Sequence, residues 1–305
     1  MDEKYDVIII GAGPAGLTAA IYCARAELKT LVLEYDAPGG KLVKTAEIAN
    51  WPGIEKTSGV DLALSMYQHA LSLQVVYRYG EVIELISEVS GHQLKCRDGQ
   101  TYFGRAIIIA SGTKERLLQV PGEQAMIGRG VSFCAICDGA FFKNEAVAIV
   151  GGGNSALEEA SYLATLVAKL YIVIRRDQFR ADQSYVSEVL ANPKIEVVYQ
   201  HVPSAVLSSD QRVSGLEIEH VTTKEKRVLE VKGIFPYIGA DPATQFVQGR
   251  GITDEAGYLS VNSEMATAIP GIYGAGDVCA KQLRQVVTAA NDGAIAAVNV
   301  SHYLK

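Results

Sequence analysis

Two glycine-rich turns, 140 residues apart, constrain the fold of this 305-residue chain more than any other feature. The first, residues 11–16, reads Gly-Ala-Gly-Pro-Ala-Gly, and the second, residues 151–156, reads Gly-Gly-Gly-Asn-Ser-Ala. Each follows a short apolar segment, residues 5–10 or 146–150, and precedes a segment of small and apolar residues typical of a helix. In such strand–turn–helix units, glycine lets the backbone approach a pyrophosphate at the helix N-terminus. The chain therefore predicts two units that each bind a dinucleotide.

The residues that end the second strand of each unit predict different dinucleotides. In the first unit this strand ends in Glu34, whose carboxylate can accept hydrogen bonds from ribose hydroxyl groups. The same negative charge disfavours a ribose 2′-phosphate, so this unit suits FAD or NAD better than NADP. In the second unit the strand is followed by Arg175, Arg176 and, four residues later, Arg180. Guanidinium groups bind phosphate by charge and bidentate geometry, which favours NADP over the alternative of a solvated basic surface.

A pair of cysteines with an adjoining carboxylate stands before the second turn. Cys134 and Cys137 are three residues apart, and Asp138 follows directly. If residues 132–139 form the first turn of a helix, the two sulfurs share one face at disulfide distance, and the helix N-terminus lowers the pKa of a thiol. Asp138 can then move a proton when a thiolate leaves or arrives.

Two alternatives to a redox pair are half of a zinc site and a chance pair of buried thiols. The other cysteines, Cys23, Cys96 and Cys279, stand alone, and the five histidines include no closely spaced pair of the kind that completes a zinc site. We therefore favour redox chemistry and expect no metal site.

Charge and hydropathy exclude several classes of partner. The formal net charge is -6 without any basic tract, so we expect neither nucleic acid nor an anionic membrane as a partner. No apolar run reaches the ~18 residues that a membrane-spanning helix needs. Residues 1–6 are acidic and lead straight into a strand, so we expect no secretory or transit segment and a cytoplasmic protein. In that compartment a Cys-x-x-Cys pair is more often catalytic than structural.

The C-terminal segment contains a third glycine-rich turn. Residues 258–261 read as a strand, residues 271–278 as a strand and turn, and residues 285–303 as one long helix of small residues. Asp277 follows three glycines and is a candidate ligand for a ribityl hydroxyl group. If this segment returns to the first unit, the second unit is an insertion within the first.

Six motifs follow one another along the chain. They are residues 11–16, residues 134–138 (Cys-Ala-Ile-Cys-Asp), residues 151–156, residues 175–181 (Arg-Arg-Asp-Gln-Phe-Arg-Ala), residues 274–278 (Gly-Ala-Gly-Asp-Val) and residues 284–290 (Arg-Gln-Val-Val-Thr-Ala-Ala). In this order, and over essentially the whole chain, they resemble the low-molecular-weight thioredoxin reductases, a family of FAD-containing pyridine nucleotide-disulfide oxidoreductases.

The resemblance implies an α/β fold of two Rossmann-like, three-layer dinucleotide-binding domains. The FAD domain would be discontinuous, with residues 1–114 and 242–305, and the inserted NADPH domain, with the redox disulfide, would be residues 115–241. The implied enzyme is a thioredoxin-disulfide reductase, usually a homodimer, that uses NADPH, FAD and the Cys134–Cys137 pair to reduce thioredoxin or a thioredoxin-like protein. The resemblance also implies that Cys137 faces the flavin and that Asp138 is the general acid. Either sulfur can be the one that attacks the partner.

The motifs and the resemblance together give three groups of site residues. The catalytic residues are Cys134, Cys137 and Asp138. The expected FAD ligands are Gly11, Gly13, Pro14, Ala15, Gly16, Glu34, Gly39, Gly40, Leu42, Asn50, Ala110, Ser111, Gly112, Gly276, Asp277, Gln285 and Val286. The expected NADPH ligands are Gly153, Asn154, Ser155, Arg175, Arg176, Arg180 and Gly239.

Two positions depart from the family pattern. Ile174 stands where the arginine motif usually opens with a histidine, which bears on the preference between NADPH and NADH. Ala140 stands where a bulky apolar residue is common, which bears on the surface that meets thioredoxin.

The alternative functions share the fold or its ligands. One is a flavoprotein disulfide reductase with ferredoxin or NADH as electron donor, or with oxygen or another disulfide as acceptor; the three arginines count against ferredoxin. A binding protein without catalysis is disfavoured by the cysteine pair. An alkyl hydroperoxide reductase flavoprotein would have a long N-terminal extension, so its first glycine turn would come later than Gly11.

Overall fold

The computed structural model describes residues 4–45, 48–88 and 90–305, so residues 1–3 of the acidic start lie outside the described ranges. The chain forms two compact units, Met1–Lys114 with Asp241–Lys305, and Glu115–Ala240. The chain passes between them through β7 (Thr113–Glu115) and β15 (Ala240–Pro242), which pair with each other. The boundary expected after residue 241 differs from this division by one residue, because β15 spans it.

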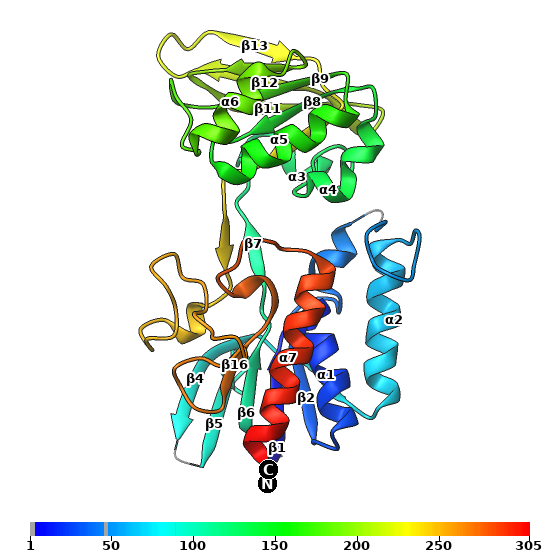
Figure 1. Ribbon diagram of the computed structural model, residues 1–305, viewed down its shortest axis with the longest axis vertical. Coiled ribbons are helices and arrows are strands. Elements are labelled where there is room, and N and C mark those ends of the chain that lie inside the picture. The colour runs from blue at the N-terminus through cyan, green and yellow to red at the C-terminus, as the bar shows by residue number, and fades with distance from the viewer. Residues whose placement is uncertain (1–3, 46–47, 89) are drawn as a thin grey trace. The chain divides into compact units, whose positions relative to one another are not determined.

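The first unit is built on a seven-stranded mixed sheet (Figure 1). The order is β3-β2-β1-β6-β5-β4, and β16 also pairs with β6. The central pairs are parallel, whereas β5 and β4 are antiparallel to their neighbours. Because Ile272 of β16 pairs with Ile107 of β6, the C-terminal segment returns to the sheet that the first strand begins. The strands are β1 (Lys4–Ile10), β2 (Thr30–Glu34), β3 (Val76–Tyr79), β4 (Val82–Glu88), β5 (Gly91–Cys96), β6 (Thr101–Ile109) and β16 (Ile272–Gly274).

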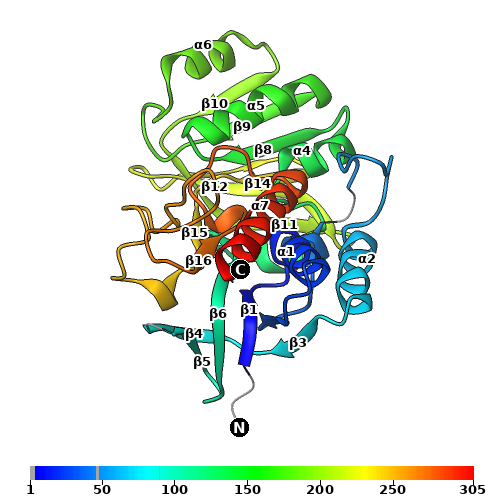
Figure 2. The ribbon, with the colours of Figure 1, turned by 60° about the horizontal axis from the view of Figure 1, so that its bottom comes forward.

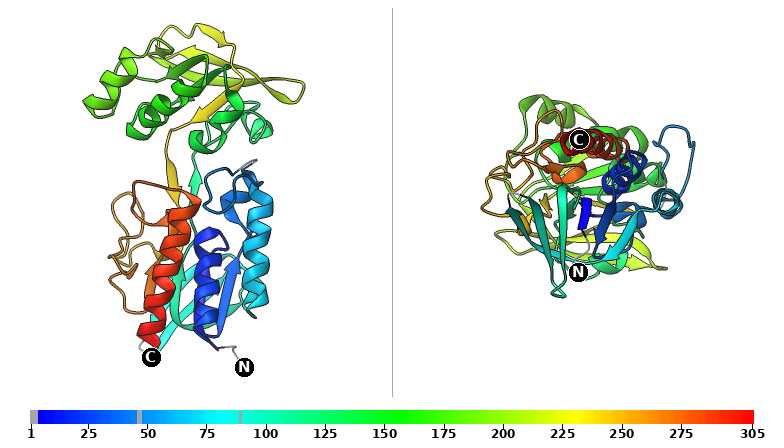
Figure 3. Two further views of the ribbon diagram at one scale, coloured as in Figure 1. Left: turned by 45° about the vertical axis from the view of Figure 1, so that its right-hand side comes forward. Right: turned by 90° about the horizontal axis from the view of Figure 1, so that it is seen from below.

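Three helices, α1 (Pro14–Arg25), α2 (Gly59–Ser72) and α7 (Val286–Leu304), cover one face of this sheet (Figure 3). Small residues let α1 and α7 lie side by side, as Figure 2 also shows. A Cβ atom on Gly293 of α7 would lie 2.1 Å from the carbonyl oxygen of Ala15 in α1. This close approach explains the small-residue character of both helices.

Residues of β1 alternate between two cores, as expected for a strand buried on both faces. Val7 and Ile9 pack with the helices α1 and α7. Ile8 and Ile10 point to the opposite face, where they join apolar residues of β4, β5 and the segment that contains Leu259.

The strand expected at residues 258–261 is wrong. Leu259 alone pairs there, through isolated bridges to Thr253 and Cys279. The Asp254 carboxylate accepts hydrogen bonds from the N–H groups of Ala256 and Tyr258, which closes a turn in place of a strand ladder.

The second unit has three layers around a four-stranded parallel sheet of order β10-β9-β8-β14. In β8, Val147 and Ile149 pack against helix α5, whereas Ala148 and Val150 pack against the antiparallel sheet β11-β12-β13. Figure 2 shows α5 and α6 beside the parallel strands. The α/β fold with Rossmann-like parallel sheets predicted from the sequence is confirmed. The elements are β8 (Ala146–Val150), α5 (Asn154–Leu166), β9 (Lys169–Val173), α6 (Gln183–Ala191), β10 (Ile195–Val198), β11 (His201–Ser209), β12 (Arg212–His220), β13 (Lys226–Leu229) and β14 (Gly233–Pro236).

Short helical turns complete both units. They are η1 (Gly40–Lys44), α3 (Glu123–Met126), α4 (Ala135–Asp138), η2 (Gly139–Phe142), η3 (Gln245–Val247) and η4 (Gly276–Val278). In the part of the chain that the structure describes, no helix combines the length and apolar character needed to cross a bilayer.

Candidate active site

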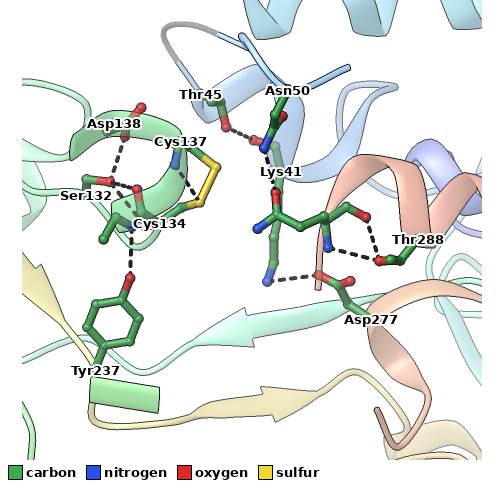
Figure 4. Close-up of a disulfide and its surroundings, with 12 residues drawn as sticks. Lys41, Thr45, Asn50, Ser132, Cys134, Cys137, Asp138, Tyr237, Asp277 and Thr288 are labelled. Carbon is green, nitrogen blue, oxygen red and sulfur yellow. Dashed lines mark hydrogen bonds and ion pairs between the residues drawn. A yellow bond between two sulfur atoms is a disulfide. The ribbon is translucent and has the colours of Figure 1, made fainter. Parts of the chain in front are cut away.

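The two cysteines of the motif form a disulfide in a single helical turn of the second unit (Figure 4). Cys134 caps the N-terminus of α4, and its Cα atom lies 5.3 Å from that of Cys137. The N–H of Cys137 donates to Cys134 Sγ at 3.2 Å, and the N–H of Asp138 donates to the Cys134 carbonyl at 3.1 Å. The helix is shorter than expected, so its dipole adds little to thiolate stability. The local N–H donor to Cys134 Sγ takes its place.

Two side chains outside α4 hold this turn (Figure 4). The hydroxyl of Ser132 donates to Asp138 Oδ2 at 2.6 Å and accepts from the N–H of Cys134 at 3.2 Å. The hydroxyl of Tyr237, just after β14, accepts from the N–H of Ala135 at 2.8 Å. Neither residue was predicted as a site residue from the sequence. The end of β14 was the available signal for Tyr237, because β14 pairs with β8, whose C-terminal end leads into the second glycine turn.

The three other cysteines are chemically unlike the pair. Cys23, Cys96 and Cys279 are buried free thiols. Burial raises the pKa to about 12 for Cys23, about 11 for Cys96 and about 12 for Cys279. Such thiols supply almost no thiolate near neutral pH, so they are inert in exchange reactions.

The first glycine turn leaves open space at the start of α1. A Cβ atom on Gly11, whose φ is +104°, would lie 2.4 Å from the Ala110 carbonyl oxygen, and one on Gly16 would lie 1.9 Å from the Gly11 oxygen. In contrast, no atom lies within 4 Å of the Cβ position of Gly13. The first turn of α1 has no acidic residue and no side-chain cap. The turn therefore fits a diphosphate such as that of FAD, which its N–H groups would bind.

Glu34 lies at the end of β2 with its carboxylate buried against this turn. Its Oε2 accepts from the N–H of Ala12 at 2.7 Å, and its Oε1 accepts from the N–H groups of Tyr35 and Asp36 at 2.8 and 3.0 Å. Burial raises the pKa of Glu34, while these three donors oppose the rise. A carboxylate has about four acceptor positions, so one is left for a ribose hydroxyl.

The loop after β2 folds back onto the same turn. The N–H of Gly39 donates to the carbonyl of Ala12 at 2.8 Å, and a Cβ on Gly40 would lie 3.3 Å from the Cα of Gly13. Leu42 is buried in a small apolar core beneath this loop. These contacts bring the predicted residues of the loop beside the predicted diphosphate site.

The predicted residues after β6 lie along the same edge of the sheet. The N–H of Ala110 donates to the Ile10 carbonyl at 2.8 Å. The Ser111 hydroxyl donates to the Ala243 carbonyl at 2.7 Å, and the Gly112 carbonyl accepts from the N–H of Ala243 at 3.0 Å.

The third glycine turn approaches the start of α1 from the C-terminal segment. A Cβ on Gly276 would lie 2.8 Å from that of Ala15. Asp277 forms an ion pair with Lys41 at 3.5 Å (Figure 4). Lys41 also donates to the hydroxyl of Thr113 at 2.7 Å. Lys41 was missed as a site residue, because nothing in its sequence context indicates a partner more than 200 residues away.

Gln285 caps the N-terminus of α7 and connects it to the loop of Asn50. The Asn50 amide donates to Gln285 Oε1 at 3.0 Å, and the Thr288 hydroxyl accepts from the N–H of Gln285 at 3.1 Å (Figure 4). Val286 is the first residue of α7 and packs beside the core that contains Leu42.

A buried ion pair, which was not predicted from the sequence, supports the third turn. Asp292 of α7 is buried, and its Oδ2 accepts from the N–H of Gly276 at 3.0 Å. The ammonium group of Lys281 contacts the same oxygen. The available signal was that Asp292 is the only acidic residue of α7, a helix rich in small and apolar residues.

The second glycine turn repeats the open geometry of the first. A Cβ on Gly151, whose φ is +145°, would lie 2.3 Å from the Tyr237 carbonyl oxygen, whereas no atom lies within 4 Å of the Cβ position of Gly153. The first turn of α5 has neither an acidic residue nor a side-chain cap. This turn too fits a dinucleotide diphosphate.

The predicted arginines lie beside the second turn. The N–H of Arg180 donates to the carbonyl of Gly152 at 2.7 Å, and Arg175 and Arg176 follow β9 with exposed side chains. Within the described ranges, none of the three guanidinium groups forms an ion pair, so their charges are available to a phosphate. Ile174 is buried, and its Cγ2 would lie 2.9 Å from a Cβ on Gly152. An apolar residue therefore suits this position.

The remaining NADPH candidates differ in their surroundings. The Asn154 amide donates to Asp182 Oδ2 at 2.9 Å, and Asn154 Oδ1 accepts from the N–H of Asp182 at 2.8 Å. Ser155 is exposed in the first turn of α5. Gly239 has a φ of +109° and accepts from the N–H of Arg116 at 3.0 Å. Asp182 was missed by the sequence analysis.

Comparison with known proteins places this geometry in a family. The model of the pyridine nucleotide-disulphide oxidoreductases matches residues 5–293. The chain is 43% identical to the thioredoxin reductase of Listeria innocua, with 100% of this chain and 95% of the relative covered. It is 41% identical to the thioredoxin reductase of Bacillus subtilis, with 100% and 96% covered.

A solved structure agrees with these relatives. The crystal structure of thioredoxin reductase from Streptococcus pyogenes superposes with a TM-score of 0.94 at 41% identity, covering 100% of this chain and 99% of that one. The chain therefore belongs to the pyridine nucleotide-disulphide oxidoreductases and, among them, to the low-molecular-weight thioredoxin reductases.

Proposed function

We propose that this protein is an NADPH-dependent thioredoxin-disulfide reductase that uses FAD and the Cys134–Cys137 pair. The observation that carries the proposal is the disulfide in α4, held in the same compact unit as a dinucleotide turn followed by three arginines that form no ion pair with the described residues. A disulfide that only stabilises the fold has no need of a nucleotide site in the same unit, whereas a disulfide that receives electrons from NADPH through FAD does.

Turnover with defined donors and acceptors tests the proposal. We expect oxidised thioredoxin to accelerate NADPH consumption many-fold. Reduced ferredoxin in place of NADPH, or oxygen or glutathione disulfide in place of thioredoxin, should support little reaction. A chain that turned over equally well with one of these replacements would have the alternative donor or acceptor instead.

We assign the FAD site to the first unit. The residues that would hold the cofactor are those around the open space at Gly13, the Glu34 carboxylate and the third turn at Asp277. Bound FAD supplies the two-electron chemistry that links a nicotinamide to a disulfide. The chain itself supplies N–H groups for the diphosphate, an acceptor for ribose and a fixed orientation. With this assignment, the FAD domain comprises residues 1–114 and 242–305, and the NADPH domain comprises residues 115–241.

The NADPH assignment makes a prediction for the arginines. Arg175→Ala and Arg176→Ala should each raise the KM for NADPH about tenfold or more and change that for NADH little, because only NADPH has the 2′-phosphate that a guanidinium group binds. Steady-state kinetics with both nucleotides measure this. Arg227→Ala, which removes an exposed arginine from β13, is the matched control and should change neither value. Equal increases for both nucleotides would contradict recognition of the 2′-phosphate.

Disulfide exchange at Cys134 and Cys137 needs both electrons and protons. Cleavage of the Cys134–Cys137 bond takes up two electrons and leaves two thiolates, and one thiolate then attacks the partner disulfide to form a mixed disulfide. The other thiolate resolves it, so the pair returns to a disulfide and the partner leaves with two thiols. Each sulfur that leaves needs a proton. The Asp138 carboxyl, oriented by Ser132, is placed to donate such a proton and to regain one from solvent before the next transfer.

Asp138→Asn tests this proton transfer. We expect disulfide exchange with thioredoxin to slow by about 10²-fold, since an amide cannot donate a proton to a leaving thiolate. Flavin reduction by NADPH should be nearly unchanged. Stopped-flow measurement of the two half-reactions separates the effects, and Asp210→Asn, at an exposed turn, is the control. If both half-reactions slowed equally, Asp138 would be structural.

The surface beside the disulfide suits a protein partner. Ile136, between the cysteines, and Phe141 expose large parts of their side chains, 38% and 50%. Phe142 instead packs in the core against Phe235. Exposed apolar groups next to a reactive sulfur favour contact with a thioredoxin-like protein. Ala140→Phe should alter the KM for thioredoxin and leave that for NADPH unchanged.

We also propose that the protein is a homodimer. Tyr22 of α1 and Val298 of α7 are exposed by 45% and 42%, and with Ile295 they line an apolar hollow on the helical face of the first unit. An exposed apolar hollow of this kind favours association. Sedimentation equilibrium should give about twice the chain mass of 32.7 kDa. A single-chain mass at micromolar concentration would contradict the dimer.

A cytoplasmic location is the remaining proposal. Its support is the exchange-active pair Cys134–Cys137, which must return to its dithiol form in each catalytic cycle. A reducing compartment maintains this state. Thiol trapping in intact cells should find Cys23, Cys96 and Cys279 reduced and the protein in the cytosolic fraction.

A further inference from the structure

We propose that Glu159 is a positioning residue of the redox pair: its carboxyl group holds the turn between the two cysteines through Ile136, and its charge controls how readily the pair forms thiolate. The inference rests on the proposed function, in that Cys134 and Cys137 are the cysteines that cycle between disulfide and dithiol.

Glu159 lies on the helix against which the cysteine turn packs. A Cβ on Gly139, directly after α4, would lie 2.8 Å from Cδ2 of Leu163, so the turn sits tightly on α5. The N–H of Ile136, one of the two residues between the cysteines, lowers the pKa of the Glu159 carboxyl. Its contact is therefore with the backbone of the redox motif itself.

The second carboxyl oxygen of Glu159 is buried. Oε2 has almost no contact with solvent and no hydrogen-bond partner among the described residues. An ionised oxygen in such a place lacks the hydration that stabilises its charge. Burial, and next the negative charge of Glu158, raise the pKa of Glu159 to about 7, although the Ile136 donor lowers it.

The groups that face this carboxyl include no cation. Glu158 lies on the same helix, and the Tyr237 hydroxyl belongs to the segment that follows β14. Burial raises the pKa of Tyr237, and the negative charges of Glu159 and Asp138 raise it further. Asp138 of α4 is a further carboxyl near the same hydroxyl, and the cysteine pair belongs to the turn that packs on α5. No lysine or arginine of the described chain offsets the charge of Glu159.

The charge of Glu159 then changes over the pH range in which the pair works. Reduction adds two electrons, breaks the S–S bond and leaves two sulfurs that bind up to two protons. Below about pH 6 the neutral carboxyl of Glu159 leaves the thiols unaffected. Above about pH 7.5 its negative charge opposes a thiolate on the neighbouring turn, which raises the thiol pKa and destabilises the reduced pair.

Glu159→Gln separates this role from simple support of the turn. The amide oxygen of glutamine still accepts from Ile136, so the hydrogen bond remains, but the charge is removed at every pH. If support alone mattered, the variant would behave like the parent protein. Glu159→Ala removes both the hydrogen-bond acceptor and the charge, so it reports the combined effect of the two.

The experiment is alkylation of the fully reduced holoprotein by iodoacetamide from pH 5.5 to pH 9, with mass spectrometry of the tryptic peptide 130–143. This peptide contains Cys134 and Cys137 and no other cysteine, so buried thiols do not interfere. We expect the parent and Glu159→Gln profiles to coincide near pH 5.5. Above pH 7 the variant should reach a given alkylation rate about one pH unit below the pH at which the parent reaches it. At pH 7.5 its alkylation should be several-fold faster than that of the parent.

Two further variants define the effect. Glu158→Gln removes a charge that raises the pKa of Glu159, so Glu159 should ionise at lower pH in this variant. The alkylation profile of Glu158→Gln should therefore depart from that of Glu159→Gln at a lower pH than the parent profile does. Glu158→Gln also keeps the test valid if Glu159→Gln folds poorly. Glu188→Gln, an exposed residue of α6, is the matched control and should leave the profile unchanged.

Equilibrium with glutathione buffers gives an independent measurement. At pH 8 the reduced form of the Glu159→Gln pair should be about tenfold more stable relative to glutathione, a rise of about 30 mV in potential. Coincident parent and Glu159→Gln profiles at all pH values, or a shift in the opposite direction, would overturn the role of Glu159. A peptide that never interconverts between disulfide and dithiol would instead overturn the proposed function, so the two failures are distinguishable.

Discussion

Cys134→Ser and Cys137→Ser should each abolish thioredoxin reduction while the protein still binds flavin. The activity should fall at least about 10³-fold, because a serine hydroxyl forms no disulfide and is a far weaker nucleophile than a thiolate. The flavin should remain, since the predicted FAD residues all lie in the other compact unit. Activity assays, together with the flavin-to-protein absorbance ratio, measure both effects.

Cys96→Ala is the matched control for these variants. Cys96 is buried in the first unit, and its raised pKa makes it unreactive. The substitution should lower the free energy of unfolding by about 1 kcal/mol and leave turnover unchanged. Substantial turnover in either serine variant of the pair would refute the role assigned to it.

Gly13→Asp and Gly153→Asp should remove one dinucleotide each. Both glycines have extended backbone that any residue adopts, and no atom lies within 4 Å of either Cβ position, so both variants should fold. Gly13→Asp puts a carboxylate where the FAD diphosphate would bind, and should weaken flavin binding by about 100-fold or more, about 2.7 kcal/mol. Gly153→Asp should keep its flavin but lose reduction by NADPH.

Each of these variants serves as the control for the other. Flavin content and anaerobic bleaching by NADPH are measured on both, and circular dichroism verifies the fold. Gly16→Asp should behave differently from Gly13→Asp, because a Cβ there would lie 1.9 Å from the Gly11 oxygen and would disrupt the turn itself. Flavin retained in Gly13→Asp, or lost in Gly153→Asp, would contradict the assignment of the two turns.

Most of the fold could be predicted because its signals are local. The apolar segments before residues 11–16 and 151–156, and the small-residue helices after them, specify strand, turn and helix within thirty residues. The return of β16 to the first sheet depends on the pairing of Ile272 with Ile107, which no local pattern specifies. The strand expected at residues 258–261 was wrong because the Asp254 side chain competes for the backbone N–H groups there.

The site was predicted where glycine or cysteine marks it, and missed where it depends on contacts between distant segments. Ser132 lies two residues before Cys134 but has no distinctive spacing, and Tyr237 reaches the turn only through the pairing of β14 with β8. Glu159 follows another acidic residue and looks like an ordinary helix surface residue in the sequence, and the partners of Asp292 lie outside its helix. Only the packing of α7 and α5 shows that these carboxyl groups are buried.

The most direct test of the central claim is anaerobic stopped-flow absorbance of the flavin, first with NADPH and then with oxidised thioredoxin. We predict that NADPH bleaches the flavin, that oxidised thioredoxin restores its absorbance, and that two thiols appear on thioredoxin for each NADPH consumed. Flavin that NADPH does not bleach would contradict the electron donor. Bleached flavin that thioredoxin does not reoxidise would contradict the acceptor.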